Sequence, residues 1–164
     1  MLVYLFIFFC NYFIMSEEID YENFYYMCGQ HNICIKADLF RKRKDYTDLL
    51  THMINVNNNC LKSRLESNKN NIFKIFVDLS NVKLKNADYE FIKMLIPFLE
   101  EAYPNNLEKM YFKNTPFIFK TAYSIIRNFI HKETRSKIIF VKKNKKDTIS
   151  EDIEFSEDKM EELF

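Results

Sequence analysis

The side chains that could carry out chemistry in this chain are few and lie far apart in the sequence. None of the three histidines belongs to an H-E-x-x-H or H-x-E metal motif: His31, His52 and His131. Gly29 is the single glycine, so the chain contains no P-loop, no G-x-G-x-x-G turn and no G-x-S-x-G nucleophile elbow. Asp78 follows an apolar run and is expected to cap the turn after it. These patterns favour a protein that is not an enzyme and that uses no cofactor or metal ion.

The four cysteines show neither a C-x-x-C pair nor the spacing of a zinc site: Cys10, Cys28, Cys34 and Cys60. Cysteines of this kind are usually small buried groups, so the sequence predicts free thiols in a reducing compartment. No asparagine begins a usable N-x-S/T glycosylation site either. Both observations favour a cytoplasmic protein.

The composition is that of one folded domain. A chain of 164 residues can bury a substantial core, and 48% apolar with 29% charged residues is typical of globular proteins. The net charge of +1 provides no overall attraction to nucleic acid, and no nucleic-acid-binding motif is present. Nucleic acid is therefore not an expected partner.

The N-terminal segment, residues 1–15, is apolar almost throughout. It is shorter than the about 20 residues of a membrane span, and it lacks the basic start and cleavage site of a signal peptide. Two interpretations stay open: a short anchor or uncleaved signal, or sequence that precedes a true start at Met15. Residues 16–164 are expected to form a single domain with an acidic C-terminal tail.

Hydrophobic periodicity predicts alternating helices and strands. The expected elements are a short helix within 16–30, a strand at 33–40, an amphipathic helix at 46–65, a strand at 72–79, a helix at 89–102, a strand at 109–113 buried on both faces, a helix at 117–130, a charged loop at 131–136 and a strand at 137–141. Pro97 should kink its helix, and Thr115 should cap the next one. The predicted fold class is α/β, a layered domain with a mostly parallel central sheet, a β-α-β-α-β core and flanking helices.

Several short motifs occur in a specific order between Phe73 and Val141. They are Val77-Asp78-Leu79-Ser80-Asn81, Tyr103-Pro104, Leu107-Glu108-Lys109, Asn114-Thr115-Pro116-Phe117 with Phe119, and Thr134-Arg135-Ser136-Lys137-Ile138. This ordered set resembles the core of the CRAL-TRIO family of lipid-binding domains. The resemblance implies a CRAL-TRIO-like fold and non-enzymatic binding of a phospholipid or another small hydrophobic ligand.

The resemblance also implies a headgroup site. In phosphatidylinositol-binding members, an acidic residue just after Tyr-Pro and a lysine that begins the last-strand motif help to hold the headgroup. Lys137 matches the lysine, whereas Asn105 stands at the acidic position. The N-terminal helical subdomain and the long gate helix of full-length members are expected to be absent. A form this short resembles the compact BCH-type branch, which binds small GTPases and other proteins.

Two hypotheses therefore remain. In the first, the helices leave an apolar pocket lined by Phe91, Leu95, Phe117, Phe119, Tyr123 and Ile126. A cavity of about 300 Å³ or more is required, and the alternative is that these side chains simply fill the core. In the second, the domain is a lipid-free adaptor that binds small GTPases, their regulators or another protein partner.

Two clusters of basic residues bear on both hypotheses. One is Arg41–Lys44, and the other includes Arg135 and Lys137 and continues through 142–146. Such clusters are either solvated faces or sites that meet an anionic membrane surface, where each basic side chain contributes about 1 kcal/mol. The expected location is cytoplasmic and peripheral to membranes.

Overall fold

The computed structural model describes residues 20–29, 31–83 and 88–141. In chain order the elements, with η for a 3-10 helix, are α2 (Tyr21–Phe24), β1 (Tyr25–Cys28), β2 (Asn32–Lys36), η1 (Ala37–Leu39), α3 (Thr47–Glu66), β3 (Phe73–Asp78), α4 (Tyr89–Ala102), β4 (Leu107–Lys113), α5 (Phe117–Ile126), η3 (Arg127–Phe129), α6 (Lys132–Ser136) and β5 (Ile138–Phe140). The apolar segment 1–15, the basic residues 142–146 and the acidic tail lie outside the described residues.

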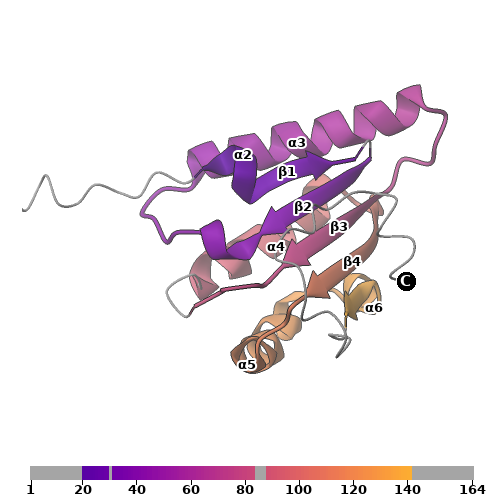
Figure 1. Cartoon of the computed structure of the whole chain (residues 1–164). Helices are drawn as coiled ribbons and strands as arrows, with labels where there is room; N and C mark the ends of the chain where they lie inside the picture. Colours follow the sequence, from indigo (N-terminus) through magenta and orange to yellow (C-terminus); the bar gives the residue numbers. More distant parts are fainter. Residues whose placement is uncertain (1–19, 30, 84–87, 142–164) are drawn as a thin grey trace, which may run out of the picture.

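The strands form one sheet in the order β1-β2-β3-β4-β5. β1 is antiparallel to β2, and the other three pairings are parallel. In Figure 1, α3 runs along the β1 side of the sheet, and α5 lies toward the β4 side. The predicted α/β fold with a mostly parallel sheet and a β-α-β-α-β core is confirmed.

The long helices cover the same face of the sheet. Each parallel connection moves one strand further in the same direction, so right-handed crossovers place α3, α4 and α5 together. Side chains of these helices pack against alternate strand residues such as Ile33, Ile75 and Val77 in one core. We call this side the inner face and the opposite side the outer face.

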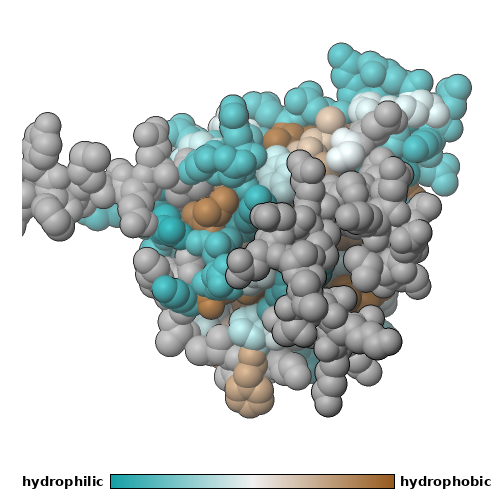
Figure 2. All heavy atoms as spheres, viewed as in Figure 1, coloured by the Kyte–Doolittle hydropathy of each residue, from teal (hydrophilic) through white to brown (hydrophobic). Residues whose placement is uncertain are grey.

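Helix α3 shows how its sequence pattern decides its position. Its buried residues are Leu49, Met53, Asn57 and Cys60, a spacing of three and four that places them on one side. The C-terminal end of α3, at the upper right in Figure 2, carries mostly hydrophilic side chains. The amphipathic helix predicted at 46–65 is therefore confirmed, and it packs on β1 and β2.

Asp88 starts helix α4. One carboxylate oxygen accepts the backbone N–H of Phe91 at 3.2 Å, and the other accepts the Tyr46 hydroxyl at 2.7 Å. Burial by itself raises the pKa of Asp88, but these hydrogen bonds and the nearby Lys42 ammonium together lower it. The helix then continues without a break through Pro97.

Five local predictions need correction. The strand predicted at 33–40 ends at Lys36, and Ala37–Leu39 form the 3-10 helix η1 instead. The segment 16–30 contains a single helical turn followed by β1, because Tyr25 pairs with β2 instead of extending a helix. Pro116, not Thr115, is the N-cap of α5. The predicted loop at 131–136 contains the one-turn helix α6. Strand β4 is half-buried along its whole length, because its neighbour β5 is only three residues long and the inner face opens into a cavity.

Asp78 has the predicted turn-capping role. Its carboxylate accepts the backbone N–H of Ser80 at 2.8 Å and the side-chain amide of Asn114 at 3.1 Å. The same amide of Asn114 also donates to the Ser80 hydroxyl at 2.7 Å. Asp78 therefore links the end of β3 to the end of β4, and these hydrogen bonds give its carboxylate a structural role.

The cysteine prediction is wrong for one pair. Cys28 and Cys34 form a disulfide, with Cα atoms 5.7 Å apart. The antiparallel pairing of β1 and β2 brings the two residues to the same face on either side of a tight turn, within the distance that a disulfide spans. Cys60 is buried and free, and burial raises the pKa of its thiol to about 11. The cysteines therefore no longer support the cytoplasmic prediction.

Candidate functional site: an apolar cavity with a polar edge

A cavity of about 520 Å³ lies between the inner face of the sheet and the helices that cover it. Its floor consists of alternate residues of the two central strands: Ile75 and Val77 of β3, and Met110 and Phe112 of β4. The cavity exceeds the about 300 Å³ that the pocket hypothesis requires, so the aromatic side chains do not fill this interior completely.

Helices α4 and α5 supply the walls through helical periodicity. Phe91, Leu95 and Leu99 are four residues apart in α4 and therefore point to the same side. Phe119 and Tyr123 do the same in α5. The ring of Phe119 also packs against Phe112, with centroids 5.3 Å apart. The aromatic residues therefore both line the cavity and pack against one another.

The charged side chains that line the cavity lie together at the end of the sheet where the parallel strands begin. They come from the last turns of α4 and from α6, next to the amino-terminal end of β5: Glu100, Glu133 and Lys137. Asn105, in the loop before β4, lies at the same end of the sheet. The cavity thus has an apolar body and one polar end, which is the arrangement that suits an amphipathic ligand.

Lys137 is held at the polar end by its backbone and by one exposed partner. Its carbonyl accepts the backbone N–H of Met110 at 2.9 Å, which fixes the residue at the start of β5. Its ammonium donates to the Glu133 carboxylate at 3.0 Å, and the side chain of Glu133 is 68% exposed. The side chain of Lys137 is only 22% exposed, so the pair is half-buried, with its carboxylate toward the solvent.

Glu100 closes the same end of the cavity. One of its oxygens accepts the backbone N–H of His131 at 3.2 Å, and the other lies 2.9 Å from Nδ1 of the same residue. The side chain of Glu100 is 13% exposed, whereas that of His131 is 79% exposed. This contact ties the end of α4 to the segment that leads into α6.

The inner part of the cavity contains one buried polar pair. The hydroxyl of Tyr25 donates to the side-chain oxygen of Asn57 at 2.6 Å, and both residues are 1% exposed. Burial raises the pKa of Tyr25, so the hydroxyl stays protonated. The pair joins β1 to α3 without introducing a charge.

Most of the site residues predicted from the sequence line this cavity: Phe91, Leu95, Asn105, Phe119, Tyr123, Ile126 and Lys137. Two do not. Phe117 is 83% exposed at the start of α5. Arg135 lies instead in an open surface depression together with Tyr123, Arg127 and Lys132.

The sequence did not reveal Glu100 or the floor residues of the cavity. For the floor a signal exists, because alternate residues of a strand face the same side and Val77 follows Ile75 by two. Glu100 has no such signal. Its role depends on how closely α4 approaches α6, which local periodicity does not determine.

None of the described helices is long and apolar enough to cross a bilayer. In the same parts of the chain, no group of three or more His, Cys, Asp or Glu side chains is placed to hold a metal ion.

The chain is similar to known proteins in both sequence and structure. Over 68 residues it is 37% identical to the phosphatidylinositol transfer protein CSR1 of Eremothecium gossypii, a match that covers 42% of this chain and 16% of that protein. The crystal structure of Sfh5 resembles it with a TM-score of 0.53 and 19% identity, covering 77% of this chain and 52% of that one. The chain therefore spans only part of the length of either. The family profile of the CRAL/TRIO domain matches residues 25–161, and the chain belongs to this family.

Proposed function

We propose that the chain binds one lipid molecule without chemical change, with the apolar part of the lipid in the inner-face cavity. The observation that carries the proposal is the cavity of about 520 Å³ with an apolar body and one charged end. Membership of the CRAL/TRIO family supports it, and one relative is named as a phosphatidylinositol transfer protein.

The polar end suggests how the lipid is oriented. A phosphate or another anionic headgroup would replace Glu133 as the partner of Lys137, while the amide of Asn105 would supply a hydrogen bond. Asn105 can still form a hydrogen bond with a headgroup, but it carries no charge, unlike the acidic residue at this position in phosphatidylinositol-binding members. Phospholipids with an anionic headgroup, phosphoinositides included, are therefore the proposed ligand class.

The outer side of α5 supports a further part of the proposal, contact with a membrane. Phe117 and Ile125 are 83% and 51% exposed, and Phe129 in the adjoining η3 is 42% exposed. These residues are spaced eight and four apart, so they follow one side of the helical segment. Basic residues lie nearby in the surface depression, among them Arg127 and Arg135. Apolar side chains beside basic ones suit the surface of an anionic bilayer, from which a lipid could enter the cavity.

The experiment is lipid capture from vesicles. The purified full chain is incubated with phosphatidylcholine vesicles that contain phosphatidylinositol, re-isolated, and its bound lipids are measured by mass spectrometry. We expect one lipid per chain. Lys137→Ala should lower the recovery of phosphatidylinositol, whereas Lys62→Ala, on the exposed side of α3, should not.

Two results would count against the proposal. Recovery of no lipid by a folded wild-type chain would overturn it and would favour the adaptor hypothesis. Equal recovery of phosphatidylinositol by Lys137→Ala and the wild type would remove the assigned role of Lys137. Phe117→Ala with Ile125→Ala should weaken vesicle binding in flotation, and unchanged flotation would overturn the membrane contact.

A further inference from the structure

The size of the inner-face cavity limits which lipids it can hold. Its volume is about 520 Å³. An engineered apolar cavity of about 150 Å³ binds one benzene molecule, so each bound carbon occupies about 25 Å³. By this ratio the inner-face cavity holds about 21 carbons. One acyl chain of about 18 carbons fits together with its glycerol, whereas two such chains need about 900 Å³.

The shape of the cavity leads to the same limit. Alternate residues line it along the whole of β3 and just beyond: Phe73, Ile75, Val77 and Leu79. At about 3.3 Å per residue they span about 20 Å. Each leaflet of a bilayer provides about 15 Å of hydrocarbon, so one extended acyl chain with its glycerol matches the cavity in length. Volume divided by length gives a mean cross-section of about 26 Å², whereas two chains side by side need about 60 Å².

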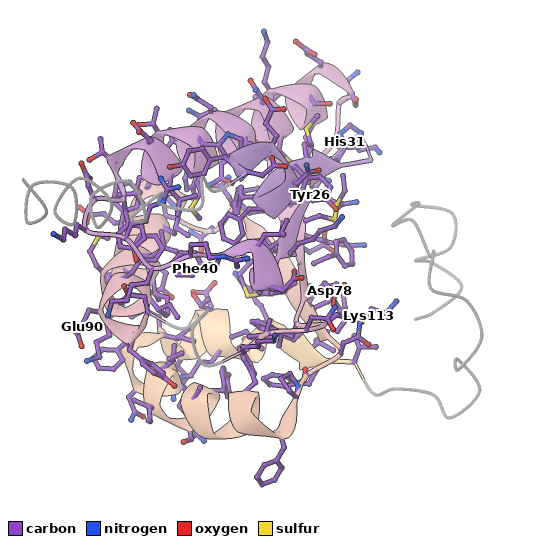
Figure 3. All side chains as sticks on the ribbon, turned by 60° about the vertical axis from the view of Figure 1, so that its left-hand side comes forward. Tyr26, His31, Phe40, Asp78, Glu90 and Lys113 are labelled. Carbon is purple, nitrogen blue, oxygen red and sulfur yellow. A yellow bond between two sulfur atoms is a disulfide. The ribbon has the colours of Figure 1, made fainter. Side chains whose placement is uncertain are left out.

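Packed aromatic side chains limit the cavity near the carboxyl ends of the strands. Phe91 of α4 stacks on Tyr46, with ring centroids 3.9 Å apart, and on Phe40 at 5.6 Å. Phe40 and Phe91 are buried, and both line the cavity. In Figure 3, Phe40 lies on the same side of the sheet as Glu90, which belongs to the first turn of α4. A second acyl chain therefore cannot enter at this end without unpacking the three rings.

The polar end of the cavity suits a headgroup with one negative charge. Lys137 is the one lysine or arginine among the described residues that line the cavity. Glu100 and Glu133 line it as well, beside His131 and Lys137. A headgroup with several phosphates would bring several negative charges close to these two carboxylates, which repel them. A singly charged headgroup contacts Lys137 with the least repulsion.

We propose that the cavity prefers a lysophospholipid, a lipid with one acyl chain, whose headgroup carries one negative charge. This inference rests on the proposed function and narrows its ligand class. The acyl chain lies along β3 with its end against Phe91, and the headgroup lies at Lys137. A phospholipid with two chains binds more weakly, because its second chain stays outside the cavity and buries no apolar surface there.

The first test is a chain-length series of lysophosphatidylglycerols, used below the concentration at which they form micelles. Each lipid competes for the purified full chain with an isotope-labelled lysophosphatidylglycerol, and native mass spectrometry measures the bound ratio. The affinity should rise about fourfold with each methylene up to about 18 carbons and then stop rising. In Ala122→Trp this limit should fall to about 14 carbons, whereas in Met94→Trp it should stay at about 18. An affinity that rises through about 24 carbons would overturn the size limit.

The second test compares one acyl chain with two under identical conditions. The full chain is incubated with phosphatidylcholine vesicles that contain equal amounts of lysophosphatidylinositol and phosphatidylinositol, and its bound lipids are measured by mass spectrometry. In the wild type, the ratio of single-chain to two-chain lipid should exceed the ratio in the vesicles about tenfold or more. Leu95→Ala with Leu99→Ala widens the cavity and should lower this ratio about threefold or more, whereas Met94→Ala should not change it. The same vesicles supply every variant, so differences in lipid solubility cancel.

The outcomes separate this inference from the proposed function. A bound ratio equal to or below that of the vesicles would overturn the preference for one chain and would leave lipid binding in place. A ratio that Leu95→Ala with Leu99→Ala does not change would overturn the cavity as its cause. A folded wild-type chain that recovers neither lipid would overturn the proposed function and this inference together.

Discussion

Ala122→Trp tests whether a ligand occupies the cavity. Ala122 lines the cavity from α5, between the wall residues Phe119 and Tyr123, and its small side chain leaves room there. A tryptophan at this position would displace on the order of four methylene groups of a bound acyl chain, each contributing about 0.8 kcal/mol. The loss is about 3 kcal/mol, which corresponds to an increase in Kd on the order of a hundredfold.

The assay is titration of each variant with vesicles or with a soluble short-chain phospholipid. Met94→Trp is the matched control, because Met94 is 45% exposed on α4 and the change also introduces a single tryptophan. It should bind as the wild type does. Leu95→Ala enlarges the cavity and should retain binding. Equal affinity of Ala122→Trp and Met94→Trp, with thermal unfolding showing both to be folded, would refute a ligand in this cavity.

Three further predictions concern stability. Asp88→Ala should lower the free energy of unfolding, measured in urea, by about 2 kcal/mol. The change removes the N-cap of α4 and leaves the Tyr46 hydroxyl without its acceptor. Asp88→Asn should lower the free energy of unfolding by less. The pKa of Asp88 is lowered below its ordinary value of 3.8 in the folded state, so its stabilisation is present above about pH 4 and is lost as the pH falls through the folded pKa. The acid-side loss of stability should therefore be shallower in Asp88→Asn, and an identical slope would contradict this. Tyr25→Phe should cost about 1 to 3 kcal/mol, because it leaves the buried Asn57 oxygen without its donor, and a change within error would contradict that contact.

The central strands and helices could be predicted because their signals are local. The strand expected at 72–79 is β3 at Phe73–Asp78, and the helix expected at 89–102 is α4 with the same bounds. A continuous apolar run indicates a buried parallel strand, and residues spaced by three and four indicate a helix. Both predictions are confirmed because each element packs its apolar side against the core, as its sequence pattern indicates.

Helical periodicity separates Phe117 from Phe119, although both were predicted to line the pocket. Phe117 and Phe119 are two residues apart in α5, and residues two apart lie on nearly opposite sides of a helix. Since Phe119 faces the cavity, Phe117 has to face outward, and it is 83% exposed. Helical periodicity alone could have assigned the two residues to different surfaces.

Other features depend on contacts between elements that no local pattern contains. The Cys28–Cys34 disulfide requires a tight turn between β1 and β2, and a spacing of six residues does not indicate one. The buried pair of Tyr25 and Asn57 joins residues that are 32 positions apart. Asn57 accepts the buried Tyr25 hydroxyl from within α3.

The most direct test of lipid binding is native mass spectrometry of the full chain purified from cells without added lipid. The account predicts a complex whose mass exceeds that of the protein by one lipid, released on activation and identified by fragmentation. It also predicts that Ala122→Trp reduces the fraction of this complex while Met94→Trp does not. A folded wild-type chain that carries only its own mass, and that takes up no phospholipid from vesicles, would contradict the account.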